Sequence, residues 1–133
     1  MKTLRIKTNF QDARGRITDI LDGVRINSVT LVRSKKATVR GNHFHKKTIQ
    51  YLYVLQGKVK YYFRKGKGPV RSVTLSPGDC GVSPPGEIHT IVSLTASHCL
   101  VLTCGPRHGT NYEADTFRPK IPLVDPKLKK VQI

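Results

Sequence analysis

Short hydrophobic stretches alternate with turn-forming residues along most of the chain. Apolar or alternating segments recur at intervals of about 8–12 residues, separated by glycine, proline and charged residues, which is typical of a β-sandwich or β-barrel. Only Asp19–Arg25 has any helical character, and it is long enough for one turn at most. The predicted strands are Leu4–Thr8, Arg16–Leu21, Ser28–Arg33, Thr38–His45, Gln50–Gln56, Lys58–Arg64, Val70–Leu75, Gly81–Ser83, Ile88–Val92 and Cys99–Cys104. We therefore expect an all-β fold, built as an antiparallel barrel or a flattened sandwich.

The length of 133 residues suits one domain, which we place at residues 1–133. The predicted strands assign the barrel to about residues 10–104. Three prolines, Pro119, Pro122 and Pro126, then exclude a regular helix or a central strand. We expect residues 105–133 to form an irregular tail that packs over the barrel or over a neighbouring subunit, with a partly disordered end as the alternative.

Histidines on two predicted strands have a spacing that suggests a site. His43 and His45 are two positions apart on a strand, so their side chains share a face. Gln50 opens the next strand, and His89 follows the turn at 84–86. We predict that these four side chains converge in one cavity. The alternative is that they are structural histidines with satisfied hydrogen bonds.

Two chemistries suit this cluster. Imidazole titrates near neutrality, so it can take a proton from a carbon beside a carbonyl and return it elsewhere. Alternatively, His43, His45, Gln50 and His89 are the ligands of one divalent transition metal ion, because neutral imidazoles suit such ions. Gln50 counts against the metal, because an amide brings no negative charge and is a weak ligand.

The net charge of the chain restricts the classes of binding partner that we expect. Lysine and arginine total 24 against 8 acidic residues, a formal net charge of +16, which favours anionic ligands such as sugar nucleotides, nucleic acid or a membrane surface. The basic residues are scattered and accompany no recognition helix or stacking aromatic motif, which argues against nucleic acid. There is no signal peptide and no apolar run near 18 residues, so we expect a cytoplasmic protein without a membrane span. Cys80, Cys99 and Cys104 lack metal-site spacing and are expected to be buried thiols in a reducing compartment.

The histidine blocks resemble the two signature motifs of the cupin superfamily. The first block is His43-Phe44-His45 with Gln50 and Gly57, and the second is Gly78, Pro84, Gly86 and His89. One segment narrows the resemblance further. It reads Arg40-Gly41-Asn42-His43-Phe44-His45-Lys46-Lys47. With Gln50 it is similar to dTDP-4-keto-6-deoxyglucose 3,4-ketoisomerases, and its first half is similar to dTDP-4-dehydrorhamnose 3,5-epimerases. The segment Asp12–Arg16 resembles a hairpin near the start of both RmlC-like families.

The resemblance implies a jelly-roll fold, also called a double-stranded β-helix, and a homodimer. It implies a metal-independent isomerase or epimerase of a keto-deoxy sugar nucleotide that needs no cofactor. His43 and His45 would then supply the acid–base pair. Arg40 and Lys47 would lie near the substrate, on its phosphates, with Gln50 and His89 as further contacts.

Two other functions stay open at this point. One is a metal-dependent cupin, either an oxygenase or an isomerase, that uses the four-residue ligand set. The other is a noncatalytic module that binds a sugar or an acidic ligand in the same pocket. One departure from the ketoisomerases bears on the substrate, because the strand 28–32 lacks the tyrosines that they carry there.

Several residues near these motifs have lesser expected roles. We expect Glu87 to cap a surface turn, and His98 and His108 to be exposed in a turn and in the tail. Asp12 and Asp115 are weak candidates for a charge partner to an imidazole.

The tyrosines form a separate set. If Gln50 faces the cavity, parity directs Tyr51 and Tyr53 away from it. Tyr53, Tyr61 or Tyr112 would be an alternative proton donor, although packing between sheets or subunits is the expected role of Tyr51 and Tyr53.

Overall fold

The computed structural model describes residues 1–127, which form strands and loops without a helix. Within that range, no helix is long and apolar enough to cross a membrane. The strands are β1 (Lys2–Leu4), β2 (Thr8–Asp12), β3 (Gly15–Thr18), β4 (Ser28–Ser34), β5 (Val39–His43), β6 (Ile49–Gln56), β7 (Val59–Lys65), β8 (Arg71–Leu75), β9 (Cys80–Ser83), β10 (Glu87–Ser93) and β11 (Ser97–Cys104). The all-β prediction is confirmed.

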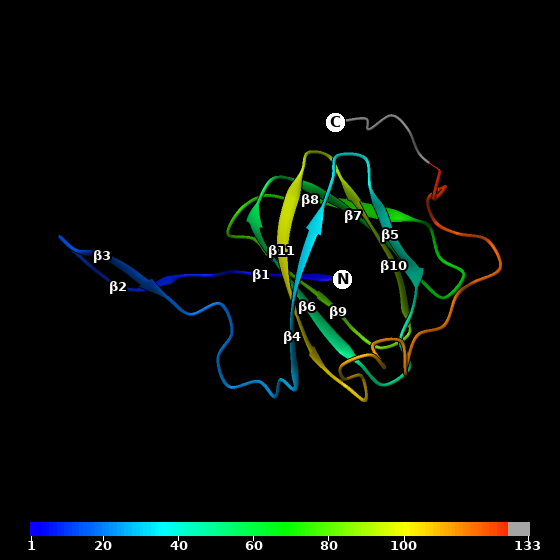
Figure 1. Ribbon diagram of the computed structural model, residues 1–133, viewed down its shortest axis with the longest axis horizontal. Coiled ribbons are helices and arrows are strands. Elements are labelled where there is room, and N and C mark those ends of the chain that lie inside the picture. Colours follow the sequence, from blue (N-terminus) through cyan, green and yellow to red (C-terminus); the bar gives the residue numbers. More distant parts are fainter. Residues whose placement is uncertain (128–133) are drawn as a thin grey trace.

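Two antiparallel sheets form the body of the molecule (Figure 1). One has the strand order β1-β9-β6-β11-β4 and the other the order β5-β10-β7-β8. In the described part of the chain no strand pairing joins the two sheets, so they form a flattened sandwich and not a closed barrel. The jelly-roll expectation therefore holds, and its barrel version does not.

The core lies between the sheets and follows from the alternation of side chains along the strands. Along β6, the side chains of Gln50, Leu52 and Val54 are buried, and those of the residues between them are not. Tyr51 and Tyr53 therefore face outward, as parity predicts. The buried cluster consists of Leu52, Val54, Val59, Tyr61, Leu75, Cys99 and Val101.

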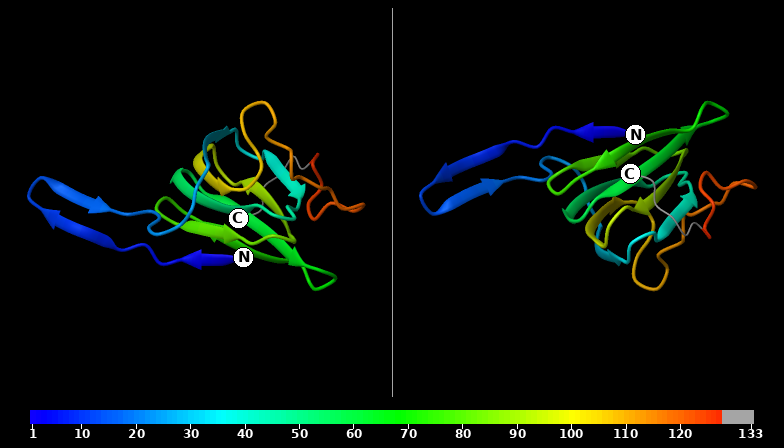
Figure 2. Two further views of the ribbon diagram at one scale, coloured as in Figure 1. Left: turned by 90° about the horizontal axis from the view of Figure 1, so that it is seen from below. Right: turned by 90° about the horizontal axis from the view of Figure 1, so that it is seen from above.

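The first hairpin departs most from the predicted strands. The sequence predicts one strand at Leu4–Thr8, but in the structure β1 ends at Leu4, β2 begins at Thr8, and the residues between them are not in a strand. Strands β2 and β3 pair only with each other, and Figure 2 shows that the ribbon they form projects away from the sandwich. Every residue of β2 is exposed, so the segment has no alternation of buried and exposed positions to mark it as a strand.

The tail after Gly105 is irregular, as predicted, and packs against the sandwich. Phe44 and Phe117 exchange two backbone hydrogen bonds of 2.9 and 3.0 Å, and their rings stack with centroids 5.7 Å apart. Further along, the side chain of Asn42 donates to the carbonyl of Val124 and accepts from its N–H, at 2.9 and 3.1 Å. The tail is thus tied to the chain on both sides of His43.

Two predictions about individual side chains are wrong. Glu87 is 4% exposed and pairs with the N-terminal ammonium of Met1, so it does not cap a surface turn. His98 lies within β11 and is half-buried, whereas His108 is exposed in the tail as expected. The cysteines lie in the described part of the chain as free thiols; Cys80 and Cys99 are buried and Cys104 is partly buried.

Candidate functional site

A cavity of about 490 Å³ opens between the two sheets. Its inner part is mainly apolar, with Val32, Leu52 and Val101 among the lining residues. Its polar part combines side chains from the strands with side chains from the tail. These polar residues include Arg40, His43, Gln50, His89, Arg107, Tyr112, Glu113 and Arg118.

The predicted convergence of three imidazoles is confirmed. The ring centroid of His43 lies 4.9 Å from that of His45 and 4.7 Å from that of His89, and the last two are 5.3 Å apart. One ring nitrogen from each histidine lies within 4.8 Å of the other two. The pairing of β5 with β10 causes this arrangement, because it sets His43 directly opposite His89. Gln50 lines the same cavity as His43 and His89, whereas His45 is buried next to these two rings and is not among the lining residues.

A close approach of two backbones supports this pairing. Gly41 has φ +103°, and a Cβ added there would lie 2.8 Å from the carbonyl oxygen of His89. The next residue, Asn42, has φ +55° and exchanges hydrogen bonds with the hydroxyl of Thr90. The pairing register shifts between His89 and Thr90. The glycine before Asn42 is therefore what lets β5 lie against β10 at the site.

The surroundings keep two of the imidazoles uncharged at neutral pH. Burial lowers the pKa of His43 to about 4, and the neighbouring His45 and Arg118 contribute. Burial also lowers the pKa of His89 well below its usual value, with His43 and His45 adding to the effect. Within residues 1–127, both ring nitrogens of His89 and Nε2 of His45 are buried without a hydrogen-bond partner. The cluster thus offers free nitrogen lone pairs and N–H groups to a ligand.

Asp115, in the tail, holds the turn that follows the His-x-His segment. Its carboxylate accepts hydrogen bonds from the backbone N–H groups of Lys46, Lys47 and Thr48 at 3.1, 2.8 and 2.8 Å. Burial alone would raise the pKa of this carboxyl group. Hydrogen bonds from Lys47, Thr48 and Lys46 together outweigh burial, so the pKa lies below its usual value. Its contact with an imidazole is made by the backbone, because the Asp115 carbonyl lies 2.7 Å from Nδ1 of His45.

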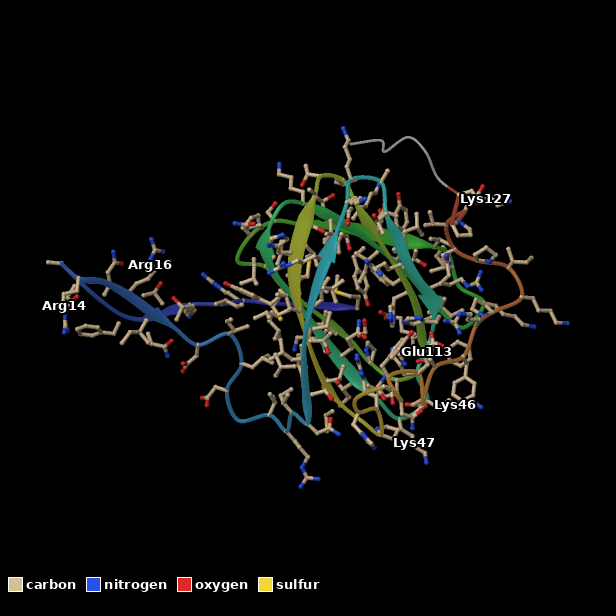
Figure 3. The ribbon with its side chains drawn as sticks, viewed as in Figure 1. Arg14, Arg16, Lys46, Lys47, Glu113 and Lys127 are labelled. Atoms are coloured by element: carbon tan, nitrogen blue, oxygen red, sulfur yellow. The ribbon has the colours of Figure 1, made fainter. Side chains whose placement is uncertain are left out.

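Asp12, the other acidic candidate, lies far from the cluster. It is bound to Arg14 in the projecting hairpin, where Figure 3 labels Arg14 at the tip. The prediction of an imidazole partner is wrong for Asp12. For Asp115 the contact exists, but through the carbonyl and not through the charge.

The predicted basic contacts lie in different places. Arg40 lines the cavity, and its guanidinium donates to the hydroxyl of Ser34 at 2.8 Å and to the carbonyl of Arg33 at 3.2 Å. Lys47 is exposed and is not among the lining residues, and Figure 3 shows it directed outward at the edge of the molecule. Only Arg40 of this pair therefore faces the cavity.

Sequence reasoning missed the charged residues that the tail brings to the cavity. Arg118 forms an ion pair with Glu113, and this contact lowers the pKa of Glu113. Arg107 donates to the hydroxyl of Thr30 at 3.4 Å. The one signal in the sequence was the acidic, tyrosine-containing segment 111–115 that follows the last predicted strand.

The tyrosines differ in their access to the site. Tyr61 stacks on His89 with centroids 5.9 Å apart, and its pKa is raised by burial and by Glu87. Tyr112 lines the cavity and is largely exposed. Together these groups surround a space that combines uncharged imidazoles with guanidinium groups, which suits proton transfer on an anionic ligand.

Solved structures with a similar fold include sugar 3,4-ketoisomerases and a dTDP-4-dehydrorhamnose 3,5-epimerase. The sugar 3,4-ketoisomerase QdtA from Thermoanaerobacterium thermosaccharolyticum, in complex with TDP, is 24% identical with a TM-score of 0.74, over 90% of this chain and 88% of that one. A 3,4-ketoisomerase from Helicobacter canadensis is 19% identical with a TM-score of 0.73, over 89% and 90% of the two chains. The dTDP-4-dehydrorhamnose 3,5-epimerase from Sulfolobus tokodaii is 17% identical with a TM-score of 0.66, over 80% and 70%. These likenesses confirm the RmlC-like cupin fold.

A search of curated proteins found no match to the chain. Residues 10–117 match a protein family described as the polysaccharide biosynthesis C-terminal domain. This match covers part of β2, the whole of β3, every strand of the sandwich except β1, and the tail as far as Phe117. Because the match extends over most of its length, the chain belongs to the family of polysaccharide biosynthesis C-terminal domains.

Proposed function

We propose that this protein isomerises or epimerises a nucleotide-linked keto-deoxy sugar by proton transfer through histidine, without a metal ion. The observation that carries this proposal is the cluster of His43, His45 and His89, of which His43 and His89 line a cavity that arginines also line. The enzymes with similar folds support the class of reaction, because their names describe sugar 3,4-ketoisomerases and a 3,5-epimerase.

The proposed reaction begins when an imidazole of His43 or His45 removes the proton from the carbon beside the ketone. The electron pair of that C–H bond moves to the carbonyl oxygen and leaves an enolate. The sugar is isomerised when the hydroxyl on the deprotonated carbon gives its proton to the former ketone oxygen and the removed proton is returned to the former carbonyl carbon, which moves the ketone by one position. The sugar is epimerised when the proton is instead returned to the opposite face of the carbon that lost it. The lowered pKa of His43 keeps its ring available as a base down to about pH 4.

The arginines have two parts in this proposal. A guanidinium near the enolate oxygen stabilises the developing negative charge, and another binds the pyrophosphate. Arg40, Gln50 and His89 keep the substrate contacts predicted for them. Because Lys47 lies outside the cavity lining, we assign its predicted phosphate contact to Arg107 and Arg118.

Exchange of solvent deuterium into the sugar tests the proposal. The wild-type protein, incubated in D₂O with dTDP-4-keto-6-deoxyglucose, is expected to place deuterium on a carbon beside the ketone, which NMR or mass spectrometry detects. His43→Asn and His45→Asn should each slow the exchange by about 100-fold or more. His108→Asn changes an exposed histidine of the tail and should leave the rate unchanged. If no dTDP-, UDP- or GDP-linked 4-keto sugar exchanges, the noncatalytic binding function replaces this proposal.

One observation favours a metal-dependent cupin as a second candidate. The three imidazoles offer nitrogens within 4.8 Å of one another, a set of neutral donors that fits a divalent transition metal. His43, His45 and His89 would hold the ion, with Gln50 beside them, and the ion would polarise the ketone as a Lewis acid. The cationic arginines weaken this fit, as does the lack of a carboxylate in the ligand group found among the described residues.

Elemental analysis of protein purified without chelators separates the two candidates. The metal-independent proposal expects less than a tenth of an equivalent of any transition metal in the wild-type protein. Near-stoichiometric metal that is lost in His45→Ala, with exchange activity lost in parallel, would replace it with the metal-dependent mechanism.

A further inference from the structure

Asp115 contacts His45 and the turn that follows it through two different groups. It is 6% exposed, lies in the tail, and reaches back to the segment between β5 and β6. Its carboxylate binds the turn formed by residues 46–48, and its backbone carbonyl binds the ring of His45. One residue therefore fixes both the turn and the ring that precedes it.

The carboxylate of Asp115 makes most of the hydrogen bonds in this arrangement. In addition to three backbone N–H groups, it accepts the hydroxyl of Thr48 at 2.9 Å. A carboxylate that accepts several hydrogen bonds is held more firmly than one with a single partner, because each bond involves a charged group. Without it, the N–H groups of Lys46, Lys47 and Thr48 would lose these acceptors in a partly buried turn.

When the ring of His45 is neutral, the carbonyl of Asp115 decides which of its nitrogens carries the hydrogen. A carbonyl oxygen only accepts hydrogen bonds, so Nδ1 at 2.7 Å from it must carry the hydrogen. In a neutral imidazole with hydrogen on Nδ1, the lone pair is on Nε2. Within the described residues, Nε2 of His45 is buried without a partner, and the ring centroid lies 4.9 Å from that of His43.

We propose that Asp115 is a positioning residue that holds His45 in the Nδ1–H tautomer, so that the ring begins the reaction as a proton acceptor at Nε2. The role of His45 as proton acceptor rests on the proposed isomerase or epimerase function. The assignment of its tautomer does not depend on that function. In this arrangement His45 takes the first proton, and the turn 46–48 keeps the ring at a fixed distance from His43 and His89.

Nitrogen-15 NMR of the histidine rings at pH 7.5 tests the tautomer directly. In the wild-type protein, His45 is expected to show a protonated Nδ1 and an unprotonated Nε2. In Asp115→Asn the amide NH₂ of the new side chain faces backbone N–H donors, which loosens the turn and shifts the carbonyl. The ring of His45 should then show a mixture of tautomers, and deuterium exchange into the keto sugar should fall by about 10–100-fold.

Two further variants keep the test decisive. Asp125→Asn is the matched control, because Asp125 also accepts a backbone N–H in the tail, at 2.9 Å from Lys127, but in an exposed turn. It should leave both the tautomer and the rate unchanged. Thr48→Val removes only the hydroxyl donor and should give a smaller change in the same direction if Asp115→Asn fails to fold.

The outcomes separate this proposal from the proposed function. A wild-type His45 that carries its proton on Nε2 overturns the proposal, as does an Asp115→Asn protein with an unchanged tautomer and rate. If the wild-type protein catalyses no exchange, the proposed function fails, while the NMR spectrum still decides the role of Asp115.

Discussion

The environment of His43 and His89 favours the uncharged form of both rings. Burial is the main cause for each, and the neighbouring imidazoles add to it because a second positive charge so close would be unfavourable. A site that works by accepting a proton benefits from this, since no fraction of the base is lost to protonation at neutral pH. The same effect makes the folded state sensitive to acid.

Stability is expected to fall between pH 6.5 and about pH 4 because of His43. Its pKa is about 4 in the folded state and 6.5 as a model value, so the unfolded chain binds more protons between these limits. The contribution of His43 to the free energy of unfolding is complete above pH 6.5 and is lost as the pH falls to 4. A pKa shift of this size corresponds to about 3 kcal/mol of stability. Urea unfolding of the wild type and His43→Gln at pH 4.5, 5.5 and 7 measures it, and the variant should show the shallower dependence.

His108→Gln is the control for this measurement, because His108 is exposed and should leave the pH dependence as it is. Asp115 does not interfere, since its pKa is lowered from 3.8 and its stabilising effect is lost only as the pH falls below the window. Equal slopes for the wild type and His43→Gln would show that the folded protein does not depress the pKa of His43.

At the scale of elements, the contact between β5 and β10 brings the two histidine blocks together. These strands pair with His43 opposite His89, and the close approach at Gly41 leaves no room for a side chain. The cavity depends on this contact because both strands contribute to its wall.

Gly41→Ala should therefore destabilise the protein and disturb the site. The left-handed backbone and the clash with the His89 carbonyl together should cost at least about 3 kcal/mol. Gly66→Ala is the matched control: Gly66 has φ +58° with no atom within 4 Å of the added Cβ, so the cost should be about 1 kcal/mol. Chemical denaturation gives both values, and a similar loss in the two variants would contradict the steric role of Gly41.

Strand periodicity explains how much of the site was predictable from the sequence. His43, Gln50 and His89 lie on strands, so alternation and turn residues place them without knowledge of the fold, whereas His45 lies two residues after the end of β5. The glycines and prolines of the turns indicated where the strands end.

The tail residues were not predictable in this way. Arg107, Glu113 and Arg118 lie on irregular chain, where no repeat relates position in the sequence to direction in space. Glu87 was misplaced for a related reason, because its partner is the N-terminal ammonium of Met1, which lies 86 positions away in the sequence. Local patterns give the sheet, but contacts between distant segments of chain decide which charges are buried.

At the scale of the whole molecule, the projecting hairpin needs a surface to cover it. Phe10 and Ile17 face each other across the β2–β3 ribbon and are 50% and 61% exposed. An isolated two-stranded ribbon is at best marginally stable in water. The exposed Val29 and Leu31 on β4 offer a second apolar surface. We propose, in agreement with the predicted homodimer, that the hairpin of one copy packs on the sandwich of another.

Sedimentation velocity tests this association. The wild-type protein should sediment as a dimer, and a Phe10→Ser, Ile17→Ser double variant should shift toward monomer because the apolar contact is lost. Ile121→Ser is the control, since Ile121 is 76% exposed in the tail and outside the hairpin. A monomeric wild type, or a double variant that stays fully dimeric, would contradict the proposed role of the hairpin.

The tail that packs on the sandwich also has a consequence for the order of events during synthesis. The strands of both sheets precede Gly105, whereas Arg107, Glu113, Asp115 and Arg118 follow it. A nascent chain on the ribosome therefore exposes everything needed for the two sheets before it exposes the residues that complete the cavity. Folding of the scaffold can begin first, and competence to bind a ligand arrives only after residues 107–118 have emerged.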